Sequence, residues 1–122
     1  MTTTLDIAND LVALCKAGKF AECGEKYWAP DVISVEAGAP PGGDPVSRGL
    51  SEVRGKGQWW AANHEVHSVE VEGPYANGDQ FVVRFKMEVT PKASGQRMTM
   101  DEMAVYTLKD GKIAEERFFY NM

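Results

Sequence analysis

The dipeptide Asp110-Gly111 lies between two alternating apolar runs, and this arrangement restricts the fold more than any other feature of the sequence. Asp-Gly suits a type I′ turn, because both central residues of that turn need positive φ. The sequence therefore predicts a long antiparallel hairpin over residues 97–120 that turns at residues 109–112.

Side chains alternate between the two faces of a strand, and this sorts the residues of the hairpin. On the first strand, one face holds Asp101, Met103, Val105 and Thr107. On the second strand, one face holds Ala114, Glu116, Phe118 and Tyr120. Apolar and acidic side chains share a face on both strands, which is unusual for a plain core and typical of a cavity wall. We therefore expect the hairpin to line a pocket.

Three helices are predicted before this hairpin. Thr3 and Asp6 form a capping box for the first helix, which Gly18 ends. The second begins at Phe20 and ends before Pro30, because proline disfavours helical geometry in the residue before it. The third spans residues 50–63, where two glycines either permit close packing or mark a break.

Strands are predicted at residues 31–36, 65–72 and 80–90, and residues 37–49 read as a loop rich in proline and glycine. An antiparallel sheet needs a cover on one face, which amphipathic helices can supply. The order of elements therefore predicts an α+β fold, in which a curved antiparallel sheet packs on three N-terminal helices as a cone.

Size and charge narrow the class of protein. The 122 residues suit one domain, 1–122, and 43% of them are hydrophobic. A net charge of −5 argues against nucleic acid or an anionic membrane as a partner. No run has membrane-spanning length, and the first residues lack the pattern of a signal peptide, so we expect a cytoplasmic protein. There, Cys15 and Cys23 would be reduced and buried.

One motif superficially suggests zinc. His64-Glu65-x-His67 places its histidines three residues apart, across the predicted boundary between a helix and a strand. The metalloprotease motif needs two histidines four residues apart on one helix. We therefore expect no metal site and no other cofactor.

Several short motifs, in this order, resemble the SnoaL-like branch of the nuclear transport factor 2-like superfamily, the cystatin-like fold shared with ketosteroid isomerases. The motifs are Gly18-Lys19-Phe20, Tyr27-Trp28-Ala29-Pro30-Asp31-Val32, Gly49-Leu50-x-x-Val53-Arg54 and Asp110-Gly111-Lys112-Ile113. The resemblance covers nearly the whole chain. It implies the fold but leaves the activity open, because this fold hosts many functions.

The resemblance places the isomerases' general base on Glu36 and their two hydrogen-bond donors on Met103 and Leu11. Neither Met103 nor Leu11 can donate a hydrogen bond to an enolate, so steroid isomerisation by that mechanism is not expected. The Asp–Arg–Asp arrangement of the similar limonene epoxide hydrolases is also missing, since no Arg-x-Asp falls on a pocket-facing strand.

Three acids are the candidate catalytic groups. If the strand faces are as predicted, Glu36, Asp101 and Glu116 converge on the cavity, where burial and repulsion raise pKa values toward neutrality. Asp101 is favoured because it lies among methionines. The alternative is that one or more of these acids lies at the rim, either solvated or paired with Arg54 or Arg117. His64 is either their proton-transfer partner or a histidine that completes a helix end.

Aromatic residues suggest the ligand. The candidate ligand-binding residues are Trp28, Trp60, Met103, Phe118 and Tyr120, with Trp59 beside them. Tryptophans that merely fill the core are the alternative, although Tyr120 matches a pocket-lining aromatic position of the isomerases.

The other face of the sheet carries Arg84, Lys86 and Glu88, and the resemblance implies a homodimer through this outer face.

Together these features predict a small-molecule-binding protein. The expected ligand is a small hydrophobic carbonyl compound. If the protein is an enzyme, it is a cofactor-free isomerase, cyclase, dehydratase or hydrolase that works by acid–base catalysis. The alternative is a ligand-binding or protein-interaction module of the same fold without catalysis, which the missing donors at Leu11 and Met103 favour.

Overall fold

The computed structural model describes residues 3–38 and 43–121, and it confirms the predicted α+β cone. The helices are α1 (Thr4–Lys16), α2 (Phe20–Tyr27) and α3 (Leu50–Asn63). The strands are β1 (Trp28–Val35), β2 (Val46–Arg48), β3 (His64–Asn77), β4 (Gln80–Pro91), β5 (Met98–Lys109) and β6 (Lys112–Phe119). Part of the loop predicted at 37–49 lies outside the described residues. None of the described helices is long and apolar enough to cross a membrane.

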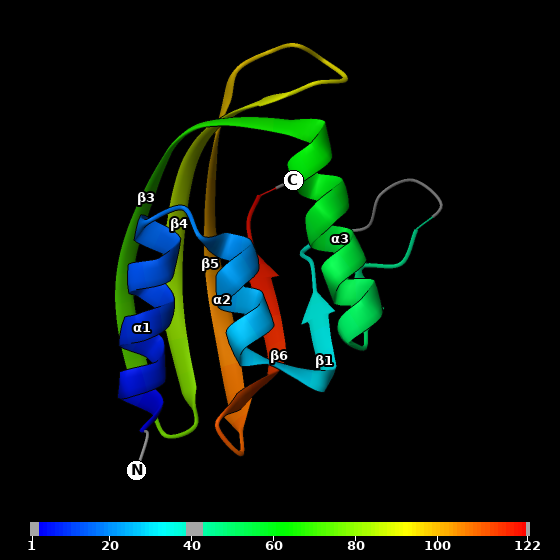
Figure 1. Ribbon diagram of the computed structural model, residues 1–122. Helices are drawn as coiled ribbons and strands as arrows, with labels where there is room; N and C mark the ends of the chain where they lie inside the picture. Colours follow the sequence, from blue (N-terminus) through cyan, green and yellow to red (C-terminus); the bar gives the residue numbers. More distant parts are fainter. Residues whose placement is uncertain (1–2, 39–42, 122) are drawn as a thin grey trace.

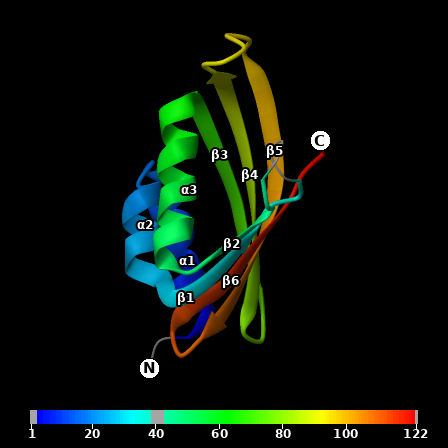
Figure 2. The same ribbon diagram turned by 90° about the vertical axis from the view of Figure 1, so that its right-hand side faces the viewer.

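The six strands form one curved sheet in the order β2-β1-β6-β5-β4-β3. Neighbouring strands are antiparallel except β1 and β6, which run parallel. All three helices cover the same face, as Figure 2 shows. We call this the inner face and the uncovered side the outer face.

The helices begin and end where their residues require. Thr3 and Asp6 form the predicted capping box at the start of α1. Gly18 has a φ of 76°, which suits glycine in the turn that follows. Helix α3 passes Gly55 and Gly57 without a break, and no atom comes within 4 Å of a Cβ built at either position. Neither close packing nor a break therefore accounts for these two glycines.

The core lies between the helices and the inner face. Alternate residues of β4 point into it, and Phe81, Val83 and Val89 are at most 1% exposed. From α1, Leu11 is equally buried. The predicted faces of β4 are therefore confirmed, with Arg84, Lys86 and Glu88 on the outer face.

Three strand predictions differ from the structure. Strand β1 was expected at residues 31–36 but spans Trp28–Val35. Strand β2 was missed, because its three residues lie within a stretch of proline and glycine that reads as a loop. Strand β3 was expected to end at Glu72 but continues to Asn77. Its register with β4 shifts between Glu72 and Tyr75, so the Gly73-Pro74 pair is absorbed as an irregularity within the ladder.

Candidate functional site

The hairpin of β5 and β6 turns as predicted but contains a bulge that changes its faces. Asp110 and Gly111 have φ values of 53° and 77°, as a type I′ turn requires. Leu108 pairs with Ile113, but Thr107 pairs with Glu115, so Ala114 is an extra residue. A one-residue shift moves a strand's side chains to the other face relative to its partner.

The bulge makes the predicted orientation of Asp101 and Met103 wrong. An uninterrupted ladder would place Glu116 beside Val105, on the face of Asp101. Instead Glu116 pairs with Tyr106. The face of β6 with Glu116 and Phe118 points inward as predicted, and on β5 the inward side chains belong to Met100, Glu102, Ala104, Tyr106 and Leu108.

Asp101 therefore points away from the helices. The Arg84 guanidinium donates to it twice, from Nε to Oδ1 at 2.9 Å and from Nη2 to Oδ2 at 2.7 Å. This pair holds the pKa of the Asp101 carboxyl below its usual value. Asp101 is thus a poor proton carrier at neutral pH, which contradicts the catalytic role predicted for it.

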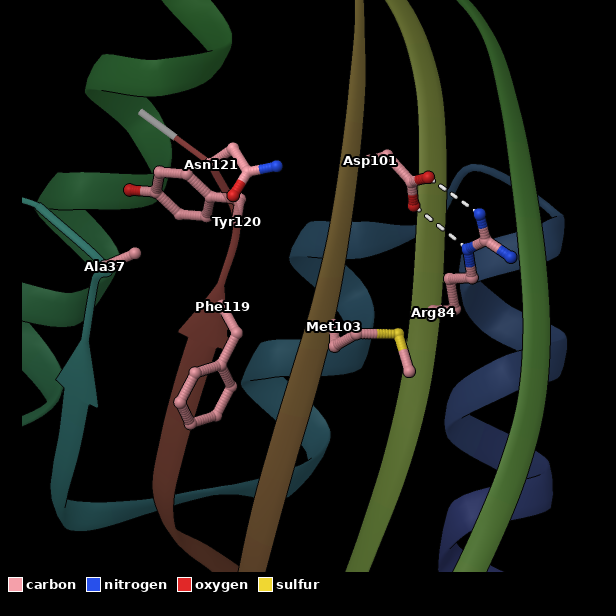
Figure 3. Close-up of a pocket in the computed structure, with 7 residues that line it drawn as sticks. All are labelled: Ala37, Arg84, Asp101, Met103, Phe119, Tyr120 and Asn121. Atoms are coloured by element: carbon pink, nitrogen blue, oxygen red, sulfur yellow. Dashed lines mark hydrogen bonds and ion pairs between the residues drawn. The ribbon is translucent and has the colours of Figure 1, made fainter.

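Asp101 and Met103 line a hollow of about 540 Å³ on the outer face, shown in Figure 3. Its other lining residues are Ala37, Arg84, Phe119, Tyr120 and Asn121. Met103 is 40% exposed and Phe119 is 52% exposed, so the hollow is an open depression with apolar walls. It lies on the opposite side of the sheet from the buried acids.

The inner face carries a polar cluster, which we call the inner-face cluster. It comprises Trp28, Ser34, Glu36, Lys56, Glu102, Glu116 and Tyr120. Trp28 and Ser34 lie on β1, Glu36 follows β1, and Lys56 lies on α3. Glu102 lies on β5, Glu116 lies on β6, and Tyr120 directly follows β6.

Glu116 is the most buried acid of this cluster, at 6% exposure. Burial raises the pKa of its carboxyl. Two donors oppose that effect: Trp28 Nε1 lies 2.6 Å from Oε1, and Ser34 Oγ lies 2.9 Å from Oε2. Both carboxyl oxygens of Glu116 therefore have partners within the protein, and its geometry suits a fixed acceptor.

Lys56 connects the other polar groups. Its Nζ lies 2.8 Å from Glu36 Oε2 and donates to Ser34 Oγ, and it stands 5.2 Å from the centre of the Phe118 ring. Glu36 also accepts from the Tyr120 hydroxyl at 3.2 Å. The side chains of Lys56 and Glu36 are 26% and 27% exposed, so solvent reaches this end of the cluster.

Glu102 has the acid–base properties that the sequence assigned to its neighbour Asp101. Burial raises the pKa of its carboxyl to about 7, the nearby charges of Glu36 and Glu116 add to this, and Lys56 opposes it. Among the described residues, no side chain donates a hydrogen bond to it. Glu102 therefore combines a raised pKa with a carboxyl that has no side-chain donor in the part of the chain that the structure describes, and this suits proton exchange near neutral pH.

The remaining predicted residues divide between core and surface. His64 stacks on Trp60 with ring centres 4.4 Å apart, and its Nδ1 lies 2.8 Å from the Trp60 carbonyl oxygen. This contact gives His64 a structural partner at the end of α3.

The predicted aromatic residues divide between surface and core. Trp59 is 59% exposed, whereas Trp28, Trp60 and Phe118 pack against the hydrophobic core. Tyr120 lies at the edge, with its ring on the outer hollow and its hydroxyl on Glu36.

Sequence reasoning missed Glu102, Lys56 and Ser34. Lys56 follows Val53 by three residues and precedes Trp60 by four, so helical spacing places it on the same face of α3 as these two residues. Ser34 alternates with the buried Val32 on β1. For Glu102, the apolar run Ala104, Tyr106 and Leu108 marked the buried face of β5 better than the acids did.

Similar structures support the fold. One is a crystal structure of a protein from Mesorhizobium loti, which is 55% identical to this chain in sequence and superposes with a TM-score of 0.92. That protein is provisionally described as a SnoaL-like polyketide cyclase, with carbohydrate phosphatase as a second description. That match covers 97% of this chain and 99% of the other chain. An NTF2-like protein from Burkholderia thailandensis is 19% identical, with a TM-score of 0.82 and coverage of 99% and 92%.

A third structure, from Catenulispora acidiphila, has a ketosteroid isomerase-like fold and was crystallised with trimethylamine. It is 18% identical, with a TM-score of 0.73 and coverage of 98% and 88%. No curated protein matches the chain. The SnoaL-like domain model matches residues 1–120. The protein is therefore a member of the SnoaL-like domain family.

Proposed function

We propose that this protein binds a small, uncharged, hydrophobic carbonyl compound at the inner-face cluster and catalyses a proton transfer without a cofactor. Glu102 is the proton carrier, in place of the predicted Asp101. The observation that carries the proposal is the position of Glu102. It is a largely buried carboxyl with a pKa of about 7, and no described residue donates a hydrogen bond to it.

The proposed step is balanced within the site. The Glu102 carboxylate takes a proton from the carbon next to the ligand's carbonyl group, and the electron pair moves onto the carbonyl oxygen to give an enolate. Glu102 then returns the proton to a different carbon of a conjugated enolate, as an isomerase would. In a cyclase, the enolate carbon instead attacks a second carbonyl carbon of the same molecule, the π electrons of that carbonyl move onto its oxygen, and the resulting alkoxide takes the proton from Glu102. No external oxidant or reductant is needed.

The other charged residues have supporting roles in this proposal. The Lys56 ammonium favours the negative charge that develops on the ligand, since an opposite charge nearby stabilises an anion. Glu36 and Ser34 hold Lys56 in place through their hydrogen bonds. Glu116 holds Trp28 and Ser34. Glu36 and Glu116 therefore act as positioning residues, and Trp28, Trp60 and Phe118 supply the apolar wall.

Proton exchange in deuterated water tests this proposal without knowledge of the natural substrate. Acetophenone carries exchangeable protons on the carbon next to its carbonyl, and proton NMR follows their loss. We expect the wild-type protein to accelerate the exchange and Glu102→Gln to remove the acceleration. Asp101→Asn is the matched control, because it changes the neighbouring acid on the opposite face. Equal exchange rates for Glu102→Gln and wild type would refute the role of Glu102.

A second part of the proposal concerns the outer face, where we place the contact between two copies of the chain. The exposed Met103 and Phe119 support it, as does the close pairing of Arg84 with Asp101, the two charged side chains that line the described hollow. Sedimentation velocity should show a dimer for wild type and a monomer for Phe119→Glu. A wild-type monomer at micromolar concentration would exclude this interface. If proton exchange is also absent, the results favour the alternative, a ligand-binding module without catalysis.

A further inference from the structure

Of the described residues, Tyr120 alone belongs both to the inner-face cluster and to the lining of the outer hollow. Its ring forms part of the wall of the hollow, and its hydroxyl donates to Glu36 Oε1 at 3.2 Å. Figure 3 shows this hydroxyl pointing away from Asp101 and Met103. One side chain therefore connects the exposed face of the sheet with the cluster on its other face.

A continuous chain of hydrogen bonds runs inward from Tyr120. Glu36 accepts from Tyr120 through Oε1 and from Lys56 Nζ through Oε2 at 2.8 Å. Lys56 Nζ also donates to Ser34 Oγ, and the Ser34 hydroxyl donates to Glu116 Oε2 at 2.9 Å. A displacement of Tyr120 therefore releases Glu36 first and loosens the Lys56 ammonium next.

Tyr120 lies beyond the paired part of β6. The pairing of β6 with β5 ends at Phe119, opposite Met103, and its pairing with β1 ends at Arg117. The backbone ladder therefore does not fix Tyr120. Its position depends on the packing of its ring and on the contacts of its hydroxyl.

Water competes for the Tyr120 hydroxyl as long as the hollow is uncovered. A hydrogen bond that water can replace adds little stability, whereas the exclusion of water strengthens it, because the local dielectric constant falls. Burial and the charge of Glu36 raise the pKa of Tyr120 to about 12, so its hydroxyl remains a neutral donor. Arg84 and Asp101 neutralise each other at the same hollow, so two copies of it can meet without like-charge repulsion.

We propose that Tyr120 is a positioning residue that couples dimer formation to the inner-face cluster. A second copy of the chain covers the hollow and fixes the Tyr120 ring, and the hydroxyl then holds Glu36 and, through it, the Lys56 ammonium. The inference rests on the proposed dimer contact and deepens the proposed function, in which Lys56 stabilises the enolate. A separate monomer has every residue of the cluster, but its ammonium is held less firmly.

The Lys56 ammonium reports on this coupling whether or not the protein is a catalyst. Nitrogen-15 NMR of labelled lysine follows the exchange of ammonium protons with water, and the signal lost in Lys56→Gln gives the assignment. Phe119→Glu separates the copies, and Tyr120→Phe removes the hydroxyl but keeps the ring. Each should make ammonium exchange about fivefold faster, as expected for the loss of one hydrogen bond. Tyr75→Phe is the matched control, because Tyr75 is 65% exposed on β3 and lies outside the hollow and the cluster.

A double variant distinguishes coupling from two unrelated defects. If the interface acts through the Tyr120 hydroxyl, Phe119→Glu should have no further effect on ammonium exchange in the Tyr120→Phe background. Tyr120→Phe should still sediment as a dimer, and dilution into monomers should speed ammonium exchange in wild type but not in this variant. Multiplicative effects in the double variant would overturn the inference, as would wild-type ammonium exchange that stays constant on dilution into monomers.

The outcomes also separate this inference from the proposed function. A wild-type monomer overturns the coupling, whereas the role of Glu102 stands if proton exchange on acetophenone is lost in Glu102→Gln. If Glu102→Gln keeps wild-type exchange on acetophenone while Lys56 ammonium exchange follows dimer formation, the coupling stands and the catalytic proposal fails.

Discussion

Asp101 and Glu102 are adjacent on β5 but lie on opposite faces of the sheet, and their environments shift their pKa values in opposite directions. On the outer face, Arg84 lowers the pKa of Asp101. On the inner face, burial raises the pKa of Glu102 to about 7. Two neighbouring acids thus have different properties because one points into the protein and the other points out.

Replacing Glu102 with glutamine should stabilise the protein at high pH. The folded-state pKa of Glu102 is raised above its usual 4.5, so its ionisation costs stability as pH rises from about 4.5 to about 7. Glu36 and Glu116 increase this cost and Lys56 reduces it. We expect Glu102→Gln to gain about 1–2 kcal/mol over wild type at pH 8, after allowance for partial solvent exposure, and little at pH 4.

Thermal unfolding at several pH values measures this difference. A gain of about 1 kcal/mol corresponds to several degrees in a domain of this size. A glutamine variant that is less stable than wild type at pH 8 would mean that the Glu102 carboxylate is held by favourable contacts.

Asp101→Asn should show the opposite pH dependence. The pKa of Asp101 is lowered in the folded state, so its ion pair with Arg84 adds stability above about pH 4, and this is lost as the pH falls through the folded-state pKa. The variant should therefore melt below wild type at pH 7 and converge with it at pH 2–3. Urea titrations at these pH values provide the check. A difference that grows on acidification would contradict the pairing.

Trp28→Phe tests the network around Glu116. The change removes the indole N–H that lies 2.6 Å from Glu116 Oε1 and leaves a buried carboxyl with one fewer donor. Loss of such a bond costs about 1–3 kcal/mol. It should also raise the pKa of Glu116 further, so the variant should lose more stability at pH 8 than at pH 5. Denaturant unfolding at both pH values measures this, and a loss that is the same at both would assign the effect to packing alone.

Two glycines on helices should respond in opposite ways to alanine. Gly55 in α3 is exposed, with open space around a built Cβ, so Gly55→Ala should stabilise the protein by about 0.5–1 kcal/mol through helix propensity. At Gly24 in α2, a built Cβ would lie 2.5 Å from the Trp28 ring, so Gly24→Ala should destabilise it. Thermal unfolding compares the pair. Similar melting points for the two variants would contradict the packing of Trp28 on α2.

The elements that the sequence predicted well are those with strong local signals. The capping box of α1, the turn at Asp110-Gly111 and the alternation along β4 each follow from contacts within a few residues. The relation between the faces of β5 and β6 could not be predicted in this way. The extra residue Ala114 puts Glu116 on the face opposite to that of Asp101, and a bulge of this kind carries no distinct local pattern.

The inner-face cluster was predicted only in part, because it combines residues from distant parts of the chain. Glu36 and Glu116 were identified, and the structure brings both toward Lys56. Lys56 shares a face of α3 with Val53 and Trp60, but a lysine in a helix is more typical of a solvated surface. Only the packing of α3 on β1 places its ammonium between Ser34 and Glu36.

The most direct test of the central claim is a carbon-13 NMR titration of the side-chain carboxyls, with the Glu102 signal assigned by its loss in Glu102→Gln. We expect Glu102 to titrate with a midpoint near pH 7, while Asp101 titrates below its usual value. A Glu102 midpoint near 4.5 would show that this carboxyl is solvated and would contradict its role as the proton carrier.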